Sequence, residues 1–403
     1  MKFIHIADLH LGKSLAGQSL AEDQRDWMEK FVALVREEKP AAVLIAGDVY
    51  DRAAPNDDAV KLLDDFLTKL LSVDDRLVVL MVAGNHDSGR KLAFGAGIFR
   101  KHRLHIVGET NAEVEQVVLE DEHGPVTFWL LPFTFPARIQ QVLGEETPRD
   151  YTSAIRALLA RQKIDVRGRN VLVSHQAVTW EGKESDFGGS ETVIGGVGNV
   201  DGALFHGFDY VALGHIHKAQ AVGRETMRYA GSPLCYHFDE AKHGGKGAVC
   251  VTLGAKGAVA VEVKPIAPLH RVREVRGTYE GILADERGHH APNEYVKVVL
   301  TDRYLTPEVA ETIRALFTGR GSLALAVTSE HAASMSGGGG GGACPERTLD
   351  EKFTAFWQDH HAGAAPDEEE LRLIRKVAEL VMSRESSIEA DAEALVDYAM
   401  EGR

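Results

Sequence analysis

The chain has 403 residues, 44% of them hydrophobic, and a formal net charge of −15. This length is typical of two or three globular domains, and the charge disfavours a protein that coats nucleic acid nonspecifically. Residues 348–403 contain 14 acidic and 6 basic side chains, about half of the excess, so the charge does not exclude a nucleic-acid substrate elsewhere on the chain. Three widely spaced cysteines and the lack of a signal-peptide core or long apolar run predict a cytoplasmic protein with no membrane span.

The first two thirds of the chain alternate short apolar runs with helical patterns. Residues 2–7, 41–46 and 76–82 are aliphatic and β-branched and predict buried strands. Apolar side chains at helical spacing over 20–38 and 60–71 predict helices between them. Further strands are expected at 126–132, 170–174, 210–213, 248–253 and 259–263. This order predicts an α/β fold, in which a sandwich of two mixed sheets is flanked by helices over residues 1–266.

A second, smaller domain is predicted over residues 267–333. It contains three strand-like runs and one helical pattern and is expected to be α+β; the runs are 271–276, 295–301 and 323–328, and the helix is 307–318. Residues 334–347 include six consecutive glycines, which predict a flexible linker. Apolar residues at helical spacing predict a helical tail over 348–403.

Polar, chemically reactive residues directly follow five of the predicted strands. In chain order the clusters are Asp8-Leu9-His10, Gly47-Asp48-Val49-Tyr50-Asp51-Arg52, Gly84-Asn85-His86-Asp87, Ser174-His175 and Gly214-His215-Ile216-His217. Each cluster alone has an ordinary explanation, such as an Asp that caps a turn. Because loops at the carboxyl ends of strands meet at one edge of a sheet, a single shared site explains all five together.

The residue types in these clusters predict a metal centre. Carboxylate and amide oxygens with imidazoles, and no thiolate, suit Mn²⁺, Fe²⁺, Zn²⁺ or Mg²⁺ rather than a structural cysteine-zinc site. Seven donors are too many for one ion with open positions, so we expect two divalent ions with Asp48 between them. The donors are Asp8, His10, Asp48, Asn85, His175, His215 and His217.

The motifs DxH, GDxxDR, GNHD, SH and GHxH occur in the order seen in the calcineurin-like metallophosphoesterases, which the chain resembles. The resemblance divides the donors between two ions: Asp8, His10 and His217 for one, Asn85, His175 and His215 for the other, with Asp48 as the bridge. It also implies a catalytic role for His86, which would not bind metal. Asp87 could orient the His86 ring, although capping of a turn is an equally good interpretation.

Longer stretches resemble one branch of this family. IHIADLHLGK near the N-terminus, FDYVALGHIHKAQAVG at 208–223 and YAGSPLCYHFDE at 229–240 are similar to the nuclease subunits of the bacterial SbcCD family of DNA double-strand-break repair nucleases. The resemblance implies a Mn²⁺-dependent DNA phosphodiesterase of repair and recombination at the nucleoid, both a 3′-to-5′ double-strand exonuclease and a single-strand and hairpin endonuclease. It implies a homodimer through helices in the first 110 residues, and a heterotetramer with an SbcC-like coiled-coil ATPase docked on the tail. Residues 267–333 would cap the DNA.

Five basic residues after the GNHD motif are candidates for contacts with the DNA backbone, with a solvated helix face as the alternative. They are Arg90, Lys91, Arg100, Lys101 and Arg103. Two other functions stay open: a small-substrate phosphodiesterase or protein phosphatase on the same metal core, and a non-catalytic scaffold. Roughly 140 residues after the core favour the nuclease. The presence of all seven donors and His86 disfavours the scaffold.

Overall fold

The computed structural model describes residues 1–144, 146–186, 198–242, 244–287, 292–302 and 305–331, and the short pieces 353–354, 357–358, 365–368 and 370–374. Contacts between Cα atoms divide the chain into two units, Met1–Glu330 and His331–Arg403. The predicted glycine-rich linker at 334–347 and most of the predicted helical tail lie outside the described residues. The fold that positions the predicted site belongs to Met1–Glu330.

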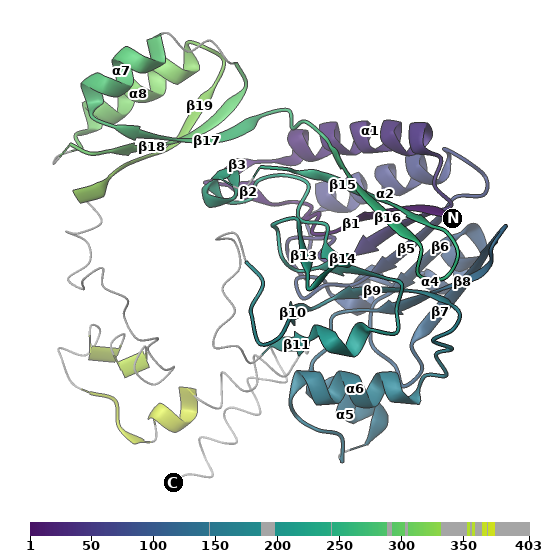
Figure 1. The fold of residues 1–403 in the computed structure, drawn as a ribbon. Helices are drawn as coiled ribbons and strands as arrows, with labels where there is room; N and C mark the ends of the chain where they lie inside the picture. The colour runs from purple at the N-terminus through teal and green to yellow at the C-terminus, as the bar shows by residue number, and fades with distance from the viewer. Residues whose placement is uncertain are drawn as a thin grey trace. The chain divides into compact units, whose positions relative to one another are not determined.

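Two six-stranded mixed sheets form the centre of this unit (Figure 1). The first has the order β16-β15-β1-β4-β5-β6, with β1 at Lys2–Ile6, β4 at Ala42–Ala46, β5 at Val78–Val82, β6 at Leu104–Val107, β15 at Gly247–Leu253 and β16 at Val259–Pro265. The second has the order β13-β14-β12-β9-β8-β7, with β7 at Glu115–Asp121, β8 at Gly124–Leu131, β9 at Arg169–His175, β12 at Tyr210–Gly214, β13 at Gln220–Val222 and β14 at Arg224–Tyr229. In each sheet four neighbouring strands run parallel. In the first sheet the antiparallel hairpin β15-β16 joins the parallel strands beside β1, and in the second sheet the edge strands β13 and β7 are antiparallel to their neighbours.

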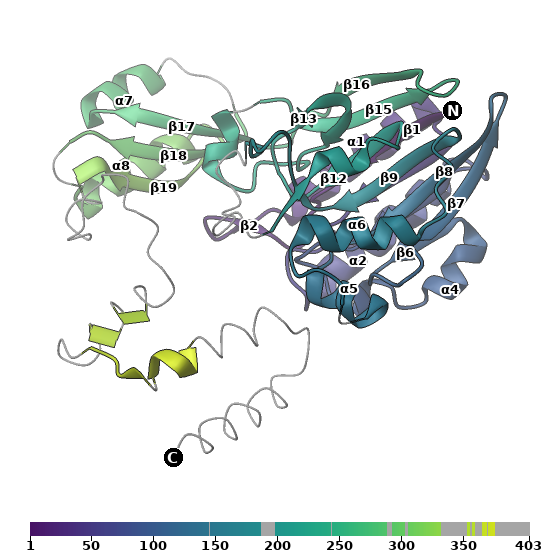
Figure 2. The same ribbon diagram turned by 60° about the horizontal axis from the view of Figure 1, so that its bottom comes forward.

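The sheets pack face to face, and helices cover their outer faces (Figure 2). Successive residues of β1 show why its sequence is apolar throughout: Phe3 packs between the sheets against Phe128 and Tyr210, whereas Ile4 belongs to the cluster under the helices. The covering helices are α1 (Ala21–Glu38) and α2 (Asp57–Leu71) on the first sheet, and α5 (Pro136–Leu143) and α6 (Tyr151–Arg161) on the second. The predicted sandwich is therefore confirmed. None of the helices in the described ranges has both the length and the apolar character needed to cross a bilayer.

A third sheet follows β16 and consists of the parallel strands β17 (Arg271–Gly277), β18 (Glu294–Leu300) and β19 (Leu323–Ser329). Helices α7 (Tyr279–Arg287) and α8 (Pro307–Thr318) connect the strands and pack on the sheet through a separate apolar cluster. The three predicted strands and α8 are found, and α7 was not predicted. On the sheet's other face Tyr295 joins the core cluster of α1, and its hydroxyl donates to buried Asp23 on that helix at 3.2 Å. The proposed boundary at residue 266 falls between β16 and β17.

Candidate metal centre

The five polar clusters converge where the parallel strands of both sheets end. In the first sheet β1, β4 and β5 end directly before the clusters of Asp8, Asp48 and Asn85, and in the second sheet β9 and β12 end at His175 and directly before His215. The two sheets approach closely at this edge, since a Cβ on Gly214 would lie 1.8 Å from the carbonyl oxygen of Ala46. The prediction of one shared site therefore agrees with the topology.

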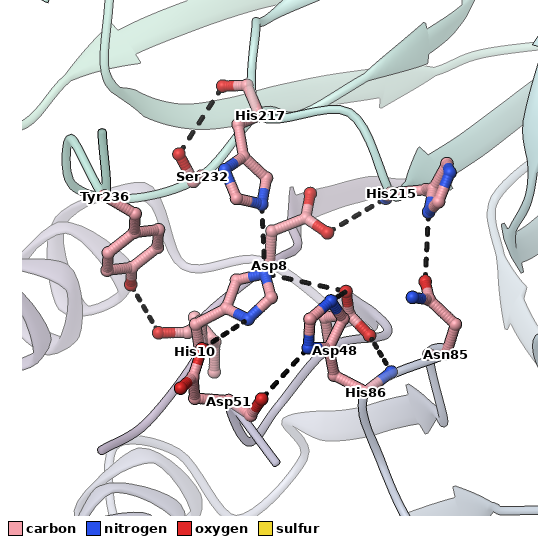
Figure 3. A network of polar contacts seen from close by, with 12 residues as sticks. Asp8, His10, Asp48, Asp51, Asn85, His86, His215, His217, Ser232 and Tyr236 are labelled. Atoms are coloured by element: carbon pink, nitrogen blue, oxygen red, sulfur yellow. Dashed lines mark hydrogen bonds and ion pairs between the residues drawn. The ribbon is translucent and has the colours of Figure 1, made fainter. Parts of the chain in front are cut away.

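One half of the cluster contains Asp8, His10 and His217, whose ligand atoms all lie within 4.8 Å of one another (Figure 3). His10 Nε2 is 3.0 Å from His217 Nε2 and 3.5 Å from Asp48 Oδ2. All four side chains are buried. Asp8 accepts a hydrogen bond from the backbone N–H of His215 through Oδ1, while its buried Oδ2 has no hydrogen-bond partner among the described residues.

The other half contains Asn85, His175 and His215. Asn85 Oδ1 lies 3.0 Å from both His175 Nε2 and His215 Nδ1. His175 Nε2 is also 3.4 Å from Asp48 Oδ2, the same oxygen that faces His10. Asp48 therefore lies between the two halves, which is the position that the sequence analysis predicted for a bridging carboxylate.

The donor atoms of the first half fit a cation between them. Ionised Glu240 can only accept, so the 3.0 Å contact with His217 Nδ1 places the ring proton there and leaves the lone pair of neutral His217 on Nε2. If His10 turns its own proton toward Asp51, whose Oδ1 is 3.6 Å from Nδ1, two lone pairs face each other. If His10 carries its proton on Nε2 instead, the lone pair of its Nδ1 faces the Asp51 carboxylate. A metal ion between the two Nε2 atoms removes either conflict and would also engage the free oxygen of Asp8.

The buried charges of the cluster favour a cation as well. Burial raises the pKa of Asp8 to about 6. Burial would also raise the pKa of Asp48, but the charge and hydrogen bond of His175 hold it well below its usual value. For His175 itself, burial would lower the pKa, but Asp48 and Asp8 raise it to about 9. A positive charge in this pocket is therefore strongly stabilised, and a metal ion can supply it in place of a proton.

Backbone strain is concentrated in the same loops. Asp8, His10, Asp48 and His215 all have positive φ, at 56°, 42°, 48° and 105°. Non-glycine residues adopt this region at a cost of about 1–3 kcal/mol each, and such strain persists where function requires the geometry. The chain therefore holds four of the seven donors in conformations that secondary structure alone would not select.

Comparisons with known proteins agree with this geometry. Residues 1–219, more than half of the chain, match the calcineurin-like phosphoesterase family. The chain belongs to this family. The SbcD component of nuclease SbcCD from Staphylococcus saprophyticus is 32% identical over 297 residues, which are 71% of this chain and 74% of that protein. The protein of the same name from Staphylococcus epidermidis is 30% identical over 304 residues, 75% of this chain and 79% of its own length.

Among solved structures, a dimetal phosphatase from Danio rerio covers 65% of this chain and 98% of its own, at 11% identity and a TM-score of 0.35. The family match and the sequence relatives show that the chain is a metal-dependent phosphodiesterase, and the buried His and Asp cluster gives this phosphoesterase the donors of a dimetal site.

The predicted catalytic histidine lies at the edge of this cluster. His86 Nδ1 donates to the backbone carbonyl of Asp51 at 2.9 Å, and Nε2 lies 4.0 Å from Asp48 Oδ2. The His86 side chain is 28% exposed, whereas that of Asp48 is 1% exposed. His86 is therefore partly accessible beside the proposed bridge.

Asp87 has the other role that the sequence left open, that of a turn cap. Its carboxylate is buried and accepts from the backbone N–H groups of Val49, Tyr50 and Gly84 at 2.9–3.1 Å. Three amide donors occupy this carboxylate, and the contact that orients the His86 ring comes from the Asp51 carbonyl instead. Asp87 thus ties the GDVYDR loop to the GNHD loop.

Four of the five basic residues proposed to bind DNA have partners within the chain. Arg90 pairs with Glu109 and Arg100 with Glu115, both at 2.8 Å. Arg103 donates to the carbonyls of Asp74 and Leu77, so its guanidinium supports the turn before β5. Lys91 approaches the carbonyl of Ala53 at 3.3 Å. Lys101 stays a candidate for a contact with DNA, and only the sequence supports it.

Sequence reasoning missed side chains that support the donors. Glu240 contacts His217, and the ring of Tyr236 lies against both His10 and His217 while its hydroxyl donates to the carbonyl of Leu9. Phe133, two residues after the end of β8, lies against His175 and His215. The motif YAGSPLCYHFDE contains Tyr236 and Glu240 and was the available signal for both. No motif marked Phe133.

Proposed function

We propose that this phosphoesterase is the nuclease subunit of an SbcCD-like complex that processes DNA ends in repair and recombination. It would act as a 3′-to-5′ double-strand exonuclease and as an endonuclease on single strands and hairpins. The observation that carries the proposal is the cluster of seven donors around Asp48, five of them buried, on a chain whose likeness to the two staphylococcal SbcD proteins extends over 297 and 304 residues. This exceeds the 219 residues of the family match, so the likeness includes segments beyond the common core.

The division of donors follows their contacts. Asp8, His10 and His217 would hold one ion and Asn85, His175 and His215 the other, with Asp48 shared. When bound, two divalent ions supply positive charge to the phosphate oxygens and activate the attacking water. We propose Mn²⁺, which the resemblance to the SbcCD nucleases implies; the hard oxygens and imidazoles of the site also suit Mg²⁺, Fe²⁺ and Zn²⁺.

His86 would act on the leaving group. The bond from Nδ1 to the Asp51 carbonyl fixes the ring and directs Nε2 toward the cluster. From there Nε2 can donate a proton or a hydrogen bond to the departing oxygen.

The proposed homodimer has support on the surface of the first 110 residues. The exposed fractions of Phe94 and Ile98 are 82% and 65%, and Phe99 at 39% belongs to the same short helix, α4 (Ala96–Phe99), as Ile98. Large apolar side chains this exposed are typical of a contact surface. A second copy of the chain is the occupant we propose. The proposed SbcC-like ATPase would dock on the tail at 348–403, the sheet β17-β18-β19 would cap DNA, and the complex would work at the nucleoid.

A cleavage assay tests the function. Purified protein with Mn²⁺ should release nucleotides from the 3′ ends of a labelled duplex and should open a hairpin, and a chelator should stop both reactions. Bis(4-nitrophenyl) phosphate serves as a small diester in parallel. If the protein hydrolyses this compound but leaves DNA intact, alone and with the ATPase, it is a small-substrate phosphodiesterase. If it binds two ions and cleaves neither substrate, the scaffold alternative holds.

A further inference from the structure

Glu240 is a buried carboxylate whose two oxygens serve different partners. It lies in the short helix η3 (Phe238–Lys242), about twenty residues after His217 in the chain. Its Oε1 is 3.0 Å from His217 Nδ1. Its Oε2 accepts from Lys246 Nζ at 2.6 Å and from Ser232 Oγ at 3.2 Å. Glu240 and Ser232 are buried, with exposed fractions of 2% and 1%.

The same group of residues also holds the backbone of His217. The N–H of Ser232 and Nζ of Lys246 both donate to the His217 carbonyl oxygen, at 3.1 and 3.0 Å. Ring and backbone are therefore fixed from one side, and the opposite edge of the ring, Nε2, faces His10 (Figure 3). Lys246 and Ser232 anchor one carboxylate oxygen, which leaves the other free to direct the imidazole.

We propose that Glu240 is a positioning residue of the metal centre, which sets the tautomer and the direction of His217 so that Nε2 can bind the ion shared with Asp8 and His10. This inference rests on the proposed assignment of His217 as a ligand. A carboxylate that accepts from the second nitrogen of a metal-bound histidine orients the ring and makes it a stronger ligand. Loss of such a partner weakens metal binding by about 10–100-fold.

Comparison with the other two buried donor histidines, His10 and His175, supports a specific role. His175 Nδ1 donates to the carbonyl of Ala46 at 2.8 Å, and His10 Nδ1 lies 3.6 Å from the carboxylate of Asp51. His217 is thus the one of these three whose Nδ1 meets a carboxylate at hydrogen-bond distance. A hydrogen bond to an ionised acceptor is stronger than one to a carbonyl. Glu240 should therefore affect the metal binding of His217 more than the Ala46 carbonyl affects that of His175.

A purely structural role for Glu240 is the competing explanation, because the ion pair with Lys246 could simply fasten η3. Glu286 offers a matched control for this role. It is also buried and also ion-paired, with Arg273 at 2.7 Å and Arg320 at 2.8 Å, but it belongs to α7 on the third sheet. Loss of either carboxylate should destabilise the fold, and only loss of Glu240 should change metal binding.

The experiment compares wild type, Glu240→Gln, Glu240→Ala and Glu286→Gln. Mn²⁺ binding is followed by equilibrium dialysis, and the magnetic coupling between two bound ions by electron paramagnetic resonance. We expect wild type and Glu286→Gln to bind two ions and show the coupled signal. Glu240→Ala should bind one ion about 10–100-fold more weakly and lose the coupled signal at low Mn²⁺. Glu240→Gln keeps an oxygen acceptor for His217, so its affinity for Mn²⁺ should lie between those of wild type and Glu240→Ala.

Excess Mn²⁺ should restore both the coupled signal and the hydrolysis of bis(4-nitrophenyl) phosphate to the Glu240 variants, which a damaged fold would not allow. The proposal is overturned if a folded Glu240 variant binds both ions with wild-type affinity. It is also overturned if Glu286→Gln loses metal to the same degree. If wild type itself binds fewer than two ions or does not cleave DNA, the proposed function fails instead, and the two failures are thus distinguishable.

Discussion

A single methyl group added at Gly84 should disable the metal centre. A Cβ at this position would lie 2.1 Å from Asp48 Oδ1 and 2.3 Å from the backbone nitrogen of Asp48. Contacts below 3.0 Å essentially do not occur, so the two groups must separate by at least 0.9 Å, the difference between 3.0 and 2.1 Å. The φ of Gly84 is not positive, and the cost of Gly84→Ala is therefore steric rather than conformational.

This displacement falls on the proposed bridge between the two ions. A shift of about 1 Å at a catalytic group can lower the rate about 10²-fold. Overpacking should also cost about 1–3 kcal/mol of the free energy of unfolding. We therefore expect Gly84→Ala to fold, to bind Mn²⁺ weakly and to hydrolyse both DNA and bis(4-nitrophenyl) phosphate about 10²-fold more slowly than wild type.

Metal content, kcat on both substrates and the thermal unfolding midpoint measure the three effects. Gly277→Ala is the control, because its Cβ would meet only Ile282, at an ordinary 3.5 Å. It should match wild type in metal content and rate. A Gly84→Ala protein with two tightly bound ions and wild-type kcat would show that Asp48 can move without consequence, and would refute the reasoning.

His86→Gln should lower kcat on DNA by about 10²–10⁴-fold with unchanged metal content, because His86 is not one of the seven proposed donors and its Nδ1 is bound to the Asp51 carbonyl; loss of metal would mean that His86 is a ligand, together with His10 and Asp48. Replacement of both Phe94 and Ile98 by Ser should convert a dimer into a monomer in sedimentation analysis while hydrolysis of the small diester is retained, and an unchanged dimer would place the interface elsewhere. Deletion of the residues after Gly342 should spare hydrolysis of the small diester and abolish copurification with the ATPase; persistent copurification would contradict docking on the tail.

The central strands could be predicted because both of their faces are buried. β1, β4, β5, β9 and β12 each contain a short, mainly apolar run, and the sequence located them within two residues at either end. The strand β7 escaped prediction because it lies at a sheet edge with mostly polar, exposed side chains. Helix α7 contains few apolar residues and was missed for a similar reason. Burial on two faces leaves a strong sequence signal, and edge positions do not.

The donors could be predicted because each follows a strand that was itself predictable. Their supports were not, because they depend on contacts between segments far apart in the chain. Turn capping by Asp87 was one open interpretation, but the sequence does not identify Val49 and Tyr50 as its partners. The motif that contains Glu240 likewise does not show that it reaches back to His217. Local sequence thus identifies chemical groups at the ends of strands, whereas the partners that orient them follow from tertiary packing.

The third sheet is connected to the metal centre through the first turn of α1. Asp23 accepts from the backbone N–H and ring of His270 and from the hydroxyl of Tyr295, at 3.0–3.2 Å. The next residue, Gln24, donates from its amide to the carbonyls of His10 and Leu9, at 2.8 and 3.2 Å. Movement of the sheet away from α1 must break the Asp23 bonds, and movement together with α1 must displace the loop that carries His10. The strand β17 also contacts η3, which carries Glu240. The third sheet is therefore connected to His10 through α1 and to His217 through Glu240, and both histidines are proposed donors of the same ion.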